Sequence, residues 1–199
     1  MQHKRSSQYL LIGIIAFFLL LFICILIRPV GLRVNSGISY YGNYTDTIVP
    51  YALAFMANSL LIWRSSLLIG HKNKADVYIG IIFKIIAISM ICILLTPHRF
   101  FYAPGFDMIH RTIGTMMFSL QMITAIWIVI FGYRDRLNAL LILIAFLSGY
   151  AALIYLLQPH GYMIQAQIIF QLSISALYIR YLNHAELRSS KKVYNKIRR

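Results

Sequence analysis

The sequence predicts an all-α membrane protein, a bundle of six transmembrane helices with both termini in the cytoplasm. Three observations support this fold class: 60% of the 199 residues are hydrophobic, only 12% are charged, and the mean hydropathy is +0.72. A soluble domain is roughly a quarter charged. The apolar residues also come in long blocks, which excludes a soluble globule, a disordered chain, a collagen and a disulfide scaffold.

Six apolar stretches of about 20 residues each are long enough to cross a hydrocarbon core of about 30 Å as helices. They are rich in Ile and Leu and lack the alternation of barrel strands. The expected spans are residues 9–27, 48–69, 77–96, 112–132, 137–157 and 162–182. We expect residues 1–199 to form a single six-span domain, with a basic cytoplasmic tail over residues 183–199.

The first stretch has to be distinguished from a cleaved signal peptide. It follows a basic start with Lys4 and Arg5, as a signal peptide does. Its apolar core is longer than the roughly 7–15 residues of a signal peptide, and no A-x-A-like cleavage site follows it at Arg28 and Pro29. We therefore expect this stretch to remain in the protein as its first span.

The loops and their basic residues predict the orientation of the other spans. Residues 71–76 and 133–136 form short turns, so the helices on either side of each turn are expected to be antiparallel neighbours. With the N-terminus inside, these turns and the tail hold most of the basic residues, whereas the longer outer loops hold only Arg28, Arg33, Arg99 and Arg111. Cytoplasmic loops accumulate Lys and Arg. The net charge of +14 therefore needs no nucleic-acid partner.

Polar side chains inside the spans are costly in hydrocarbon, so we expect them to face protein or a cavity. Helical phase places them on one stripe each of the second, fourth and sixth spans. The stripes comprise Tyr51, Ala54, Asn58 and Ser65; His110, Gly114, Phe118 and Gln121; and Gln167, Gln171, Ser175 and Tyr178, which His160 extends. Two interpretations stay open: hydrogen bonds between helices, each contributing about 0.6–2 kcal/mol, or a polar cavity that opens outward.

The candidate ligand pocket combines residues of these stripes with one lysine. Lys84 lies about two turns inside the third span, and Gly80 and Ala87 on its face predict that it points into the bundle. Snorkelling to the membrane surface is the alternative. An inward Lys84 would contact a lipid phosphate or an acidic group. The candidate pocket residues are Asn58, Lys84, Gln121, His160, Gln167 and Gln171.

Asp107 and His110 are the candidate catalytic residues. They are three residues apart at a helix start, so they can share a face, and a carboxylate that holds an imidazole forms a general base or supports a metal-ligating histidine. No H-x-x-x-H or H-E-x-x-H spacing indicates a metal site. The histidines lie at the ends of the spans, which disfavours haem. We therefore expect no metal and no cofactor.

Three short motifs give the chain a family resemblance. The loop after the first span ends in Ser39-Tyr40-Tyr41-Gly42, the third span closes on Leu94-Leu95-Thr96-Pro97, and His110 opens the fourth span ahead of Gly114 and Phe118. In this layout the chain resembles the prokaryotic six-span membrane family numbered 998 among the domains of unknown function, which is distantly similar to the Frag/DRAM/Sfk membrane proteins. The resemblance implies a six-helix fold and, by analogy with the eukaryotic relatives, a lipid-related role.

The sequence leaves three functions open. We expect a multi-pass protein of the cell membrane that binds lipid or a protein partner without catalysis, through a polar pocket toward the extracytoplasmic face. The alternative is a membrane hydrolase or transferase that acts on lipid headgroups with Asp107, His110 and His160. The third is a small transporter that works as a homodimer. The expected partners are membrane lipids and a second copy of the chain.

Overall fold

The computed structural model describes residues 2–34, 36–69, 74–96, 104–132, 135–156 and 161–197. Every regular element among these residues is helical, so the all-α fold class is confirmed. The elements are α1 (Gln2–Ile27), η1 (Pro29–Arg33), η2 (Gly37–Asn43), α2 (Ile48–Leu68), α3 (Lys74–Leu95), α4 (Pro104–Trp127), η3 (Ile128–Gly132), α5 (Arg136–Leu156) and α6 (Met163–Ile197). The short elements η1 and η2 are 3-10 helices, whereas η3 continues α4 as a π-helical turn.

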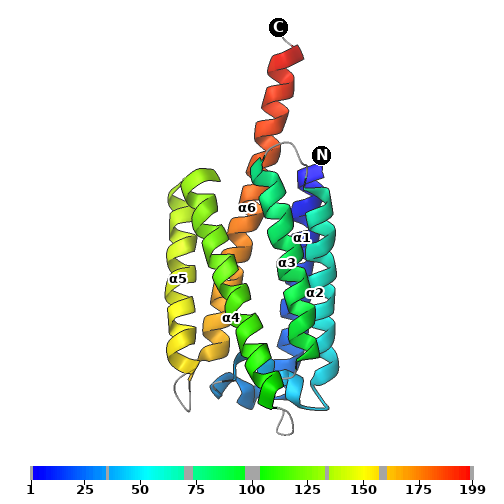
Figure 1. Cartoon of the computed structure of the whole chain (residues 1–199), viewed down its shortest axis with the longest axis vertical. Helices are drawn as coiled ribbons and strands as arrows, with labels where there is room; N and C mark the ends of the chain where they lie inside the picture. The colour runs from blue at the N-terminus through cyan, green and yellow to red at the C-terminus, as the bar shows by residue number, and fades with distance from the viewer. Residues whose placement is uncertain are drawn as a thin grey trace.

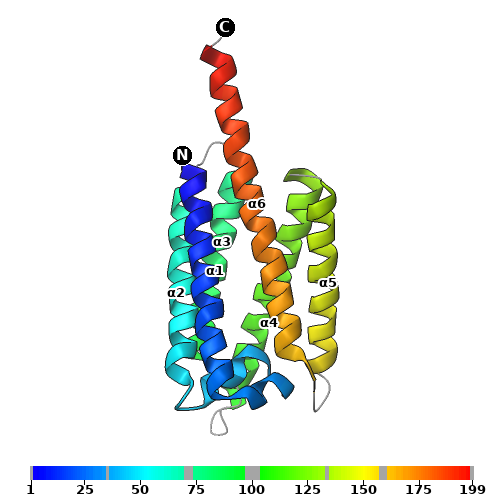
Figure 2. The ribbon, with the colours of Figure 1, turned by 180° about the vertical axis from the view of Figure 1, so that it is seen from behind.

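The six α-helices run side by side along one axis and pack in chain order around a ring (Figure 1). The ring closes where α6 packs against α1, which the reverse view shows (Figure 2). Both ends of the chain lie at one end of the bundle, and η1 and η2 cover the opposite end. We call the first end the terminal end and the second the η end.

Four helical stretches among the described residues are long and apolar enough to cross a membrane, which is the composition of a membrane protein. They are Arg5–Ile27, Lys74–Leu95, Gly105–Phe131 and Arg136–Tyr155. The helices α2 and α6 fall outside this set because they carry more polar residues, such as Asn58 and Arg64 in α2 and Gln167 and Arg180 in α6. Their lengths of 21 and 35 residues still match or exceed a span.

Two parts of the fold differ from the simplest sequence expectation. The segment between α1 and α2 contains two short helices: Pro29 starts η1, where its fixed φ suits a first helical position, and η2 begins at Gly37. The last helix does not end near residue 182 but continues to Ile197 and projects beyond the bundle (Figure 1). A basic segment can remain helical there because Lys and Arg have good helix propensity.

The outer surface of the bundle is apolar on every side. Each α-helix leaves at least one large hydrophobic side chain exposed, as expected of a lipid-facing surface. Examples in chain order are Leu19, Leu60, Ile88, Ile123, Leu147 and Ile169. Several polar side chains of the helices are buried inside the bundle, among them Asn58, Gln121, Ser148 and Ser173.

Candidate functional site

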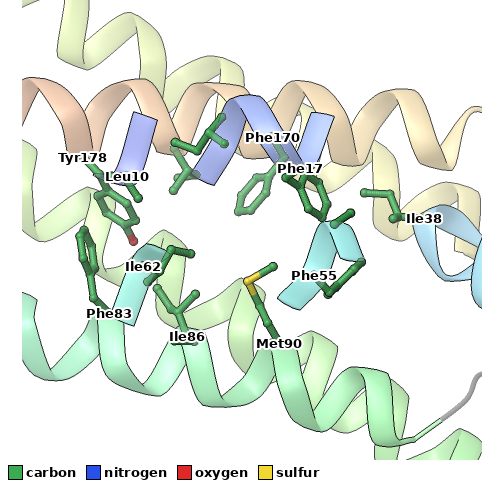
Figure 3. Close-up of a cluster of buried hydrophobic side chains, with 14 of the residues drawn as sticks. Leu10, Phe17, Ile38, Phe55, Ile62, Phe83, Ile86, Met90, Phe170 and Tyr178 are labelled. Carbon is green, nitrogen blue, oxygen red and sulfur yellow. The ribbon is translucent and has the colours of Figure 1, made fainter. Parts of the chain in front are cut away.

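A cavity of about 230 Å³ lies inside the bundle, and all six α-helices and η2 contribute side chains to it. Its wall is mainly aromatic and aliphatic. Figure 3 shows ten of these side chains pointing toward one another, with Leu10, Phe83 and Tyr178 at one end and Phe55 and Ile38 at the other. Because an apolar cavity excludes water, it favours an apolar occupant.

The cavity extends along the bundle. On α6 its lining begins at Met163 and reaches Tyr178, which at 1.5 Å per residue is a distance of about 22 Å along the helix. One leaflet of a bilayer contributes about half of the roughly 30 Å hydrocarbon core. The cavity is therefore long enough to hold one extended acyl chain.

Five polar residues of the cavity lining lie toward the η end. Ser36 and Ser39 come from the segment between α1 and α2, and His110 and Arg111 come from the first turns of α4. Gln167, near the start of α6, completes this polar rim. The rim adds a cluster of polar groups at one end of a lining that is otherwise mainly apolar.

Within the polar rim, Ser39 and His110 form a direct hydrogen bond. The distance from Ser39 Oγ to His110 Nε2 is 2.8 Å. His110 is buried, and its Nδ1 contacts the backbone carbonyl of Thr96 at the end of α3. A carbonyl oxygen only accepts, so Nδ1 carries a proton, and in the neutral ring Nε2 then accepts the hydroxyl proton of Ser39.

Gln167 fixes the turn that carries Ser39. The backbone N–H of Ile38 donates a hydrogen bond to Gln167 Oε1 at 2.9 Å. Gly37 has a φ of 62°, in the left-handed region that glycine adopts without strain. A Cβ at Gly37 would also lie 2.5 Å from Gln167 Oε1. Glycine is therefore required here for both its backbone conformation and its small size.

A second polar pair lies deeper in the cavity. Gln121 of α4 and Gln171 of α6 exchange two amide hydrogen bonds, with N–O distances of 3.1 and 3.4 Å. Next to them, on the side of the η end, the rings of Phe118 and Phe170 stack with their centroids 4.2 Å apart. These contacts hold α4 to α6, so the glutamines both line the cavity and join helices.

The structure places four of the six predicted pocket residues on this one cavity: Asn58, Gln121, Gln167 and Gln171. Lys84 does not line it, because its side chain turns toward α2, with Nζ 5.9 Å from the centroid of the Trp63 ring. His160 lies outside the described residues.

The predicted catalytic pair is arranged differently from the sequence hypothesis. Asp107 forms an ion pair with Arg111, with 2.9 Å between its carboxylate and the guanidinium Nε. His110 lines the cavity, whereas Asp107 does not, and both ring nitrogens of His110 contact Ser39 and Thr96. The side chain that hydrogen bonds to the His110 ring is therefore the hydroxyl of Ser39, which is distant in sequence.

Sequence reasoning missed Ser39 and Arg111 as site residues. Ser39 lies in a loop, where no helical period relates it to His110, 71 residues later. Arg111 lies outside the stripe because it follows His110 directly. Gly114 and Phe118 also line the cavity and share the stripe of His110. As a small and an aromatic apolar residue, they indicated helix packing only.

Outside the cavity, an ion pair at the η end joins Arg28 to Asp46. Arg28 Nε lies 2.8 Å from both carboxylate oxygens of Asp46, and its guanidinium carbon lies 3.9 Å from the centroid of the Tyr44 ring. The Arg28 guanidinium lowers the pKa of Asp46 from its usual value. Nearby, burial raises the pKa of Tyr41 to about 12, so that phenol stays protonated.

Comparisons with known proteins give no family for this chain. No protein-family model, curated protein or solved structure matches it. Among the described residues, no three His, Cys, Asp or Glu side chains come together as metal ligands would. The chemistry of the cavity itself is therefore the basis for assigning a function.

Proposed function

We propose that this protein is a six-span protein of the cell membrane that binds a single-chain amphiphile in its central cavity. The observation that carries the proposal is the cavity, which extends over about 22 Å along α6, is lined mainly by apolar side chains and has a polar rim at the η end. An amphiphile of this kind would bury its chain among the Phe and Ile side chains. Its polar group would reach the rim.

The size of the cavity favours one acyl chain over a two-chain lipid. Pockets for drug-sized ligands usually measure about 300–1,000 Å³, and this cavity of about 230 Å³ is smaller. A fatty acid or a lysolipid places one chain in such a space. A phospholipid with two chains would have to leave the second chain in the surrounding bilayer.

The charge of the rim favours an anionic headgroup. Arg111 is always charged and has five N–H donors, so it keeps donors for a ligand when its Nε is paired with Asp107. His110 and Gln167 add polar contacts on the same rim. A carboxylate or a phosphate would match this set of donors.

Six spans with both termini in the cytoplasm agree with this binding mode. The helices α2 and α6 lie alongside the four strongly apolar helices and expose Leu60 and Ile169 in the same way. The two ends of the chain lie together, as an even number of crossings requires. With the basic segments inside, the polar rim faces outward. The six-span family that the sequence resembles has this layout.

Native mass spectrometry of the gently extracted full-length protein tests the proposal, with Gly114→Leu as the blocking variant. Gly114 lines the cavity, and a Cβ there would meet no atom within 4 Å, so a leucine side chain can enter the empty space. Gly105→Leu is the matched control, because it has the same open surroundings on the same helix but lies outside the cavity lining.

We expect one retained single-chain amphiphile per wild-type chain and per Gly105→Leu chain, and none on Gly114→Leu. An increase of about tenfold or more in the dissociation constant corresponds to at least about 1.4 kcal/mol of lost binding free energy. Equal retention by all three proteins, or no retained amphiphile and no binding of added oleate or lysophospholipid, would contradict the proposal.

A further inference from the structure

We infer that Ser39 and His110 form a nucleophile and general base that hydrolyse an ester of the amphiphile bound in the cavity. The inference rests on the proposed function, which identifies the acyl chain of the substrate. The reaction itself depends on the Ser39 and His110 side chains. It differs from the sequence hypothesis in the role of Asp107, which binds Arg111 rather than completing the catalytic pair.

The geometry is that of an activated serine. A nucleophile and its base lie within about 2.6–3.2 Å of each other, and a third group orients the base. Ser39 Oγ and His110 Nε2 are 2.8 Å apart. The Thr96 carbonyl takes the role of the orienting group, since it fixes the proton on Nδ1 and leaves the Nε2 lone pair directed at Ser39.

The pair also has the access that a reaction needs. Both residues line the cavity, so a carbonyl carbon at the polar end of a bound chain can approach Ser39 Oγ. The hydroxyl is held by elements that cannot easily move apart, because the neighbouring Ile38 N–H is bonded to Gln167 on α6. Groups fixed before the substrate binds lower the cost of reaching the transition state.

The reaction proceeds in two steps with water as the second substrate. Ser39 Oγ attacks the ester carbonyl while its proton moves to His110 Nε2. The bond from the carbonyl carbon to the alcohol oxygen then breaks, and this oxygen takes the proton from Nε2 to leave as an alcohol. Water attacks the acyl-Ser39 ester with His110 again accepting a proton, and the products are a carboxylic acid and free Ser39. Arg111 supplies positive charge on the rim where the oxyanion develops.

Covalent labelling with alkyl fluorophosphonates tests this inference on the full-length protein in membranes. A serine with an activated hydroxyl displaces fluoride and forms a stable phosphonate ester on Oγ. We expect one adduct, located on Ser39 by peptide mass spectrometry, with both a long-chain and a short-chain probe. Ser39→Ala should abolish it, and His110→Gln should slow it by about 100-fold or more, since glutamine can hydrogen bond to Ser39 but cannot accept its proton.

Ser173→Ala is the matched control, because Ser173 is a buried serine of α6 that lies outside the cavity lining and whose hydroxyl donates to the Ile169 carbonyl of its own helix. This variant should label at the wild-type rate. If wild-type protein that retains its amphiphile forms no adduct on Ser39 with either probe, the inference is overturned and the hydrogen bond only joins η2 to α4. Labelling by the short probe in a protein that binds no amphiphile would instead contradict the proposed ligand and leave the catalytic pair standing.

Discussion

The contact between α1 and α2 and the contacts of α4 with α5 and α6 show two different ways of packing in one bundle. Among the described residues, α1 and α2 share the most extensive interface, whereas α4 touches α5 and α6 sparsely. Ser6 and Ser65 close the α1–α2 interface at the terminal end, with each hydroxyl within 3.0 Å of the other residue's carbonyl oxygen. Gly13 brings the two backbones close at its middle.

The α4 side is held by side chains rather than by close backbones. Stacking of Phe118 on Phe170 and the Gln121–Gln171 pair bridge a space that Gly114 leaves open. In a membrane, helices associate through small residues and polar contacts because lipid offers no hydrophobic gain. The α1–α2 interface therefore supplies stability, and the α4 side supplies the cavity. A ligand from the bilayer would enter most easily beside α4.

The largest expected effect on stability comes from a side chain between α1 and α2. In Gly13→Leu the Cβ would lie 2.8 Å from Asn58 Oδ1 and 3.1 Å from Leu61 Cβ, so the helices must separate. Overpacking of this kind costs about 1–3 kcal/mol. Thermal unfolding in detergent should show a lower midpoint for Gly13→Leu than for wild type. Gly114→Leu, with open space at its Cβ, should unfold at or above the wild-type midpoint.

The comparison fails if Gly114→Leu destabilises the protein as much as Gly13→Leu does. That result would mean that the α4 side is as tightly packed as the α1–α2 interface and that the cavity is filled by its own side chains. Gly105→Leu serves as the reference for inserting leucine in α4 outside the cavity.

A smaller effect is expected from the hydroxyl pair at the terminal end. Ser65→Ala removes the hydrogen bond from Ser65 Oγ to the Ser6 carbonyl and the 2.8 Å contact between the two hydroxyls, and it leaves the Ser6 hydroxyl with the Ser65 carbonyl. The loss should be about 0.6–2 kcal/mol, the range for polar contacts between membrane helices. A double-mutant cycle with Ser6→Ala measures the coupling between the two hydroxyls. Additive single effects, with no coupling energy, would contradict the pairing.

The smallest effect concerns the ion pair at the η end. Arg28 holds the pKa of Asp46 below its usual value in the folded protein. The stability that this pair adds is therefore present above the unfolded pKa and is lost as the pH falls through the folded pKa. Wild type should exceed Asp46→Asn in unfolding midpoint at about pH 7, and the difference should shrink as the pH falls below the ordinary pKa of an aspartate, about 3.9. High salt should also reduce it, because both groups are exposed. A difference that is independent of pH would contradict this role.

The helical bundle was predictable because long apolar stretches can be recognised in the sequence by their length and hydropathy. The spans over residues 77–96 and 137–157 coincide closely with α3 and α5. Helical phase also placed His110, Gly114, Phe118 and Gln121 on the face that lines the cavity, since α4 is regular over this region. A period of 3.6 residues carries information only within one helix.

The parts that sequence reasoning missed depend on contacts between distant segments. Ser39 meets His110 only because η2 folds across the end of the bundle, and no pattern in residues 28–47 predicts two 3-10 helices there. The direction of Lys84 likewise depends on a neighbouring helix, because Gly80 and Ala87 are buried while Lys84 Nζ lies 5.9 Å from the centroid of the Trp63 ring of α2. Long flexible side chains follow local partners more than helical phase.

Photo-crosslinking with a fatty acid that carries a diazirine near the end of its chain tests the central claim most directly. If the cavity binds the chain, saturable crosslinks should map to lining residues such as Phe83, Ile86 and Phe170, and Gly114→Leu should remove them. Crosslinks at lipid-facing Leu19 and Ile123 should be weak and should not saturate. Labelling confined to the lipid-facing residues, and unchanged by Gly114→Leu, would contradict the assignment of the cavity as a binding site.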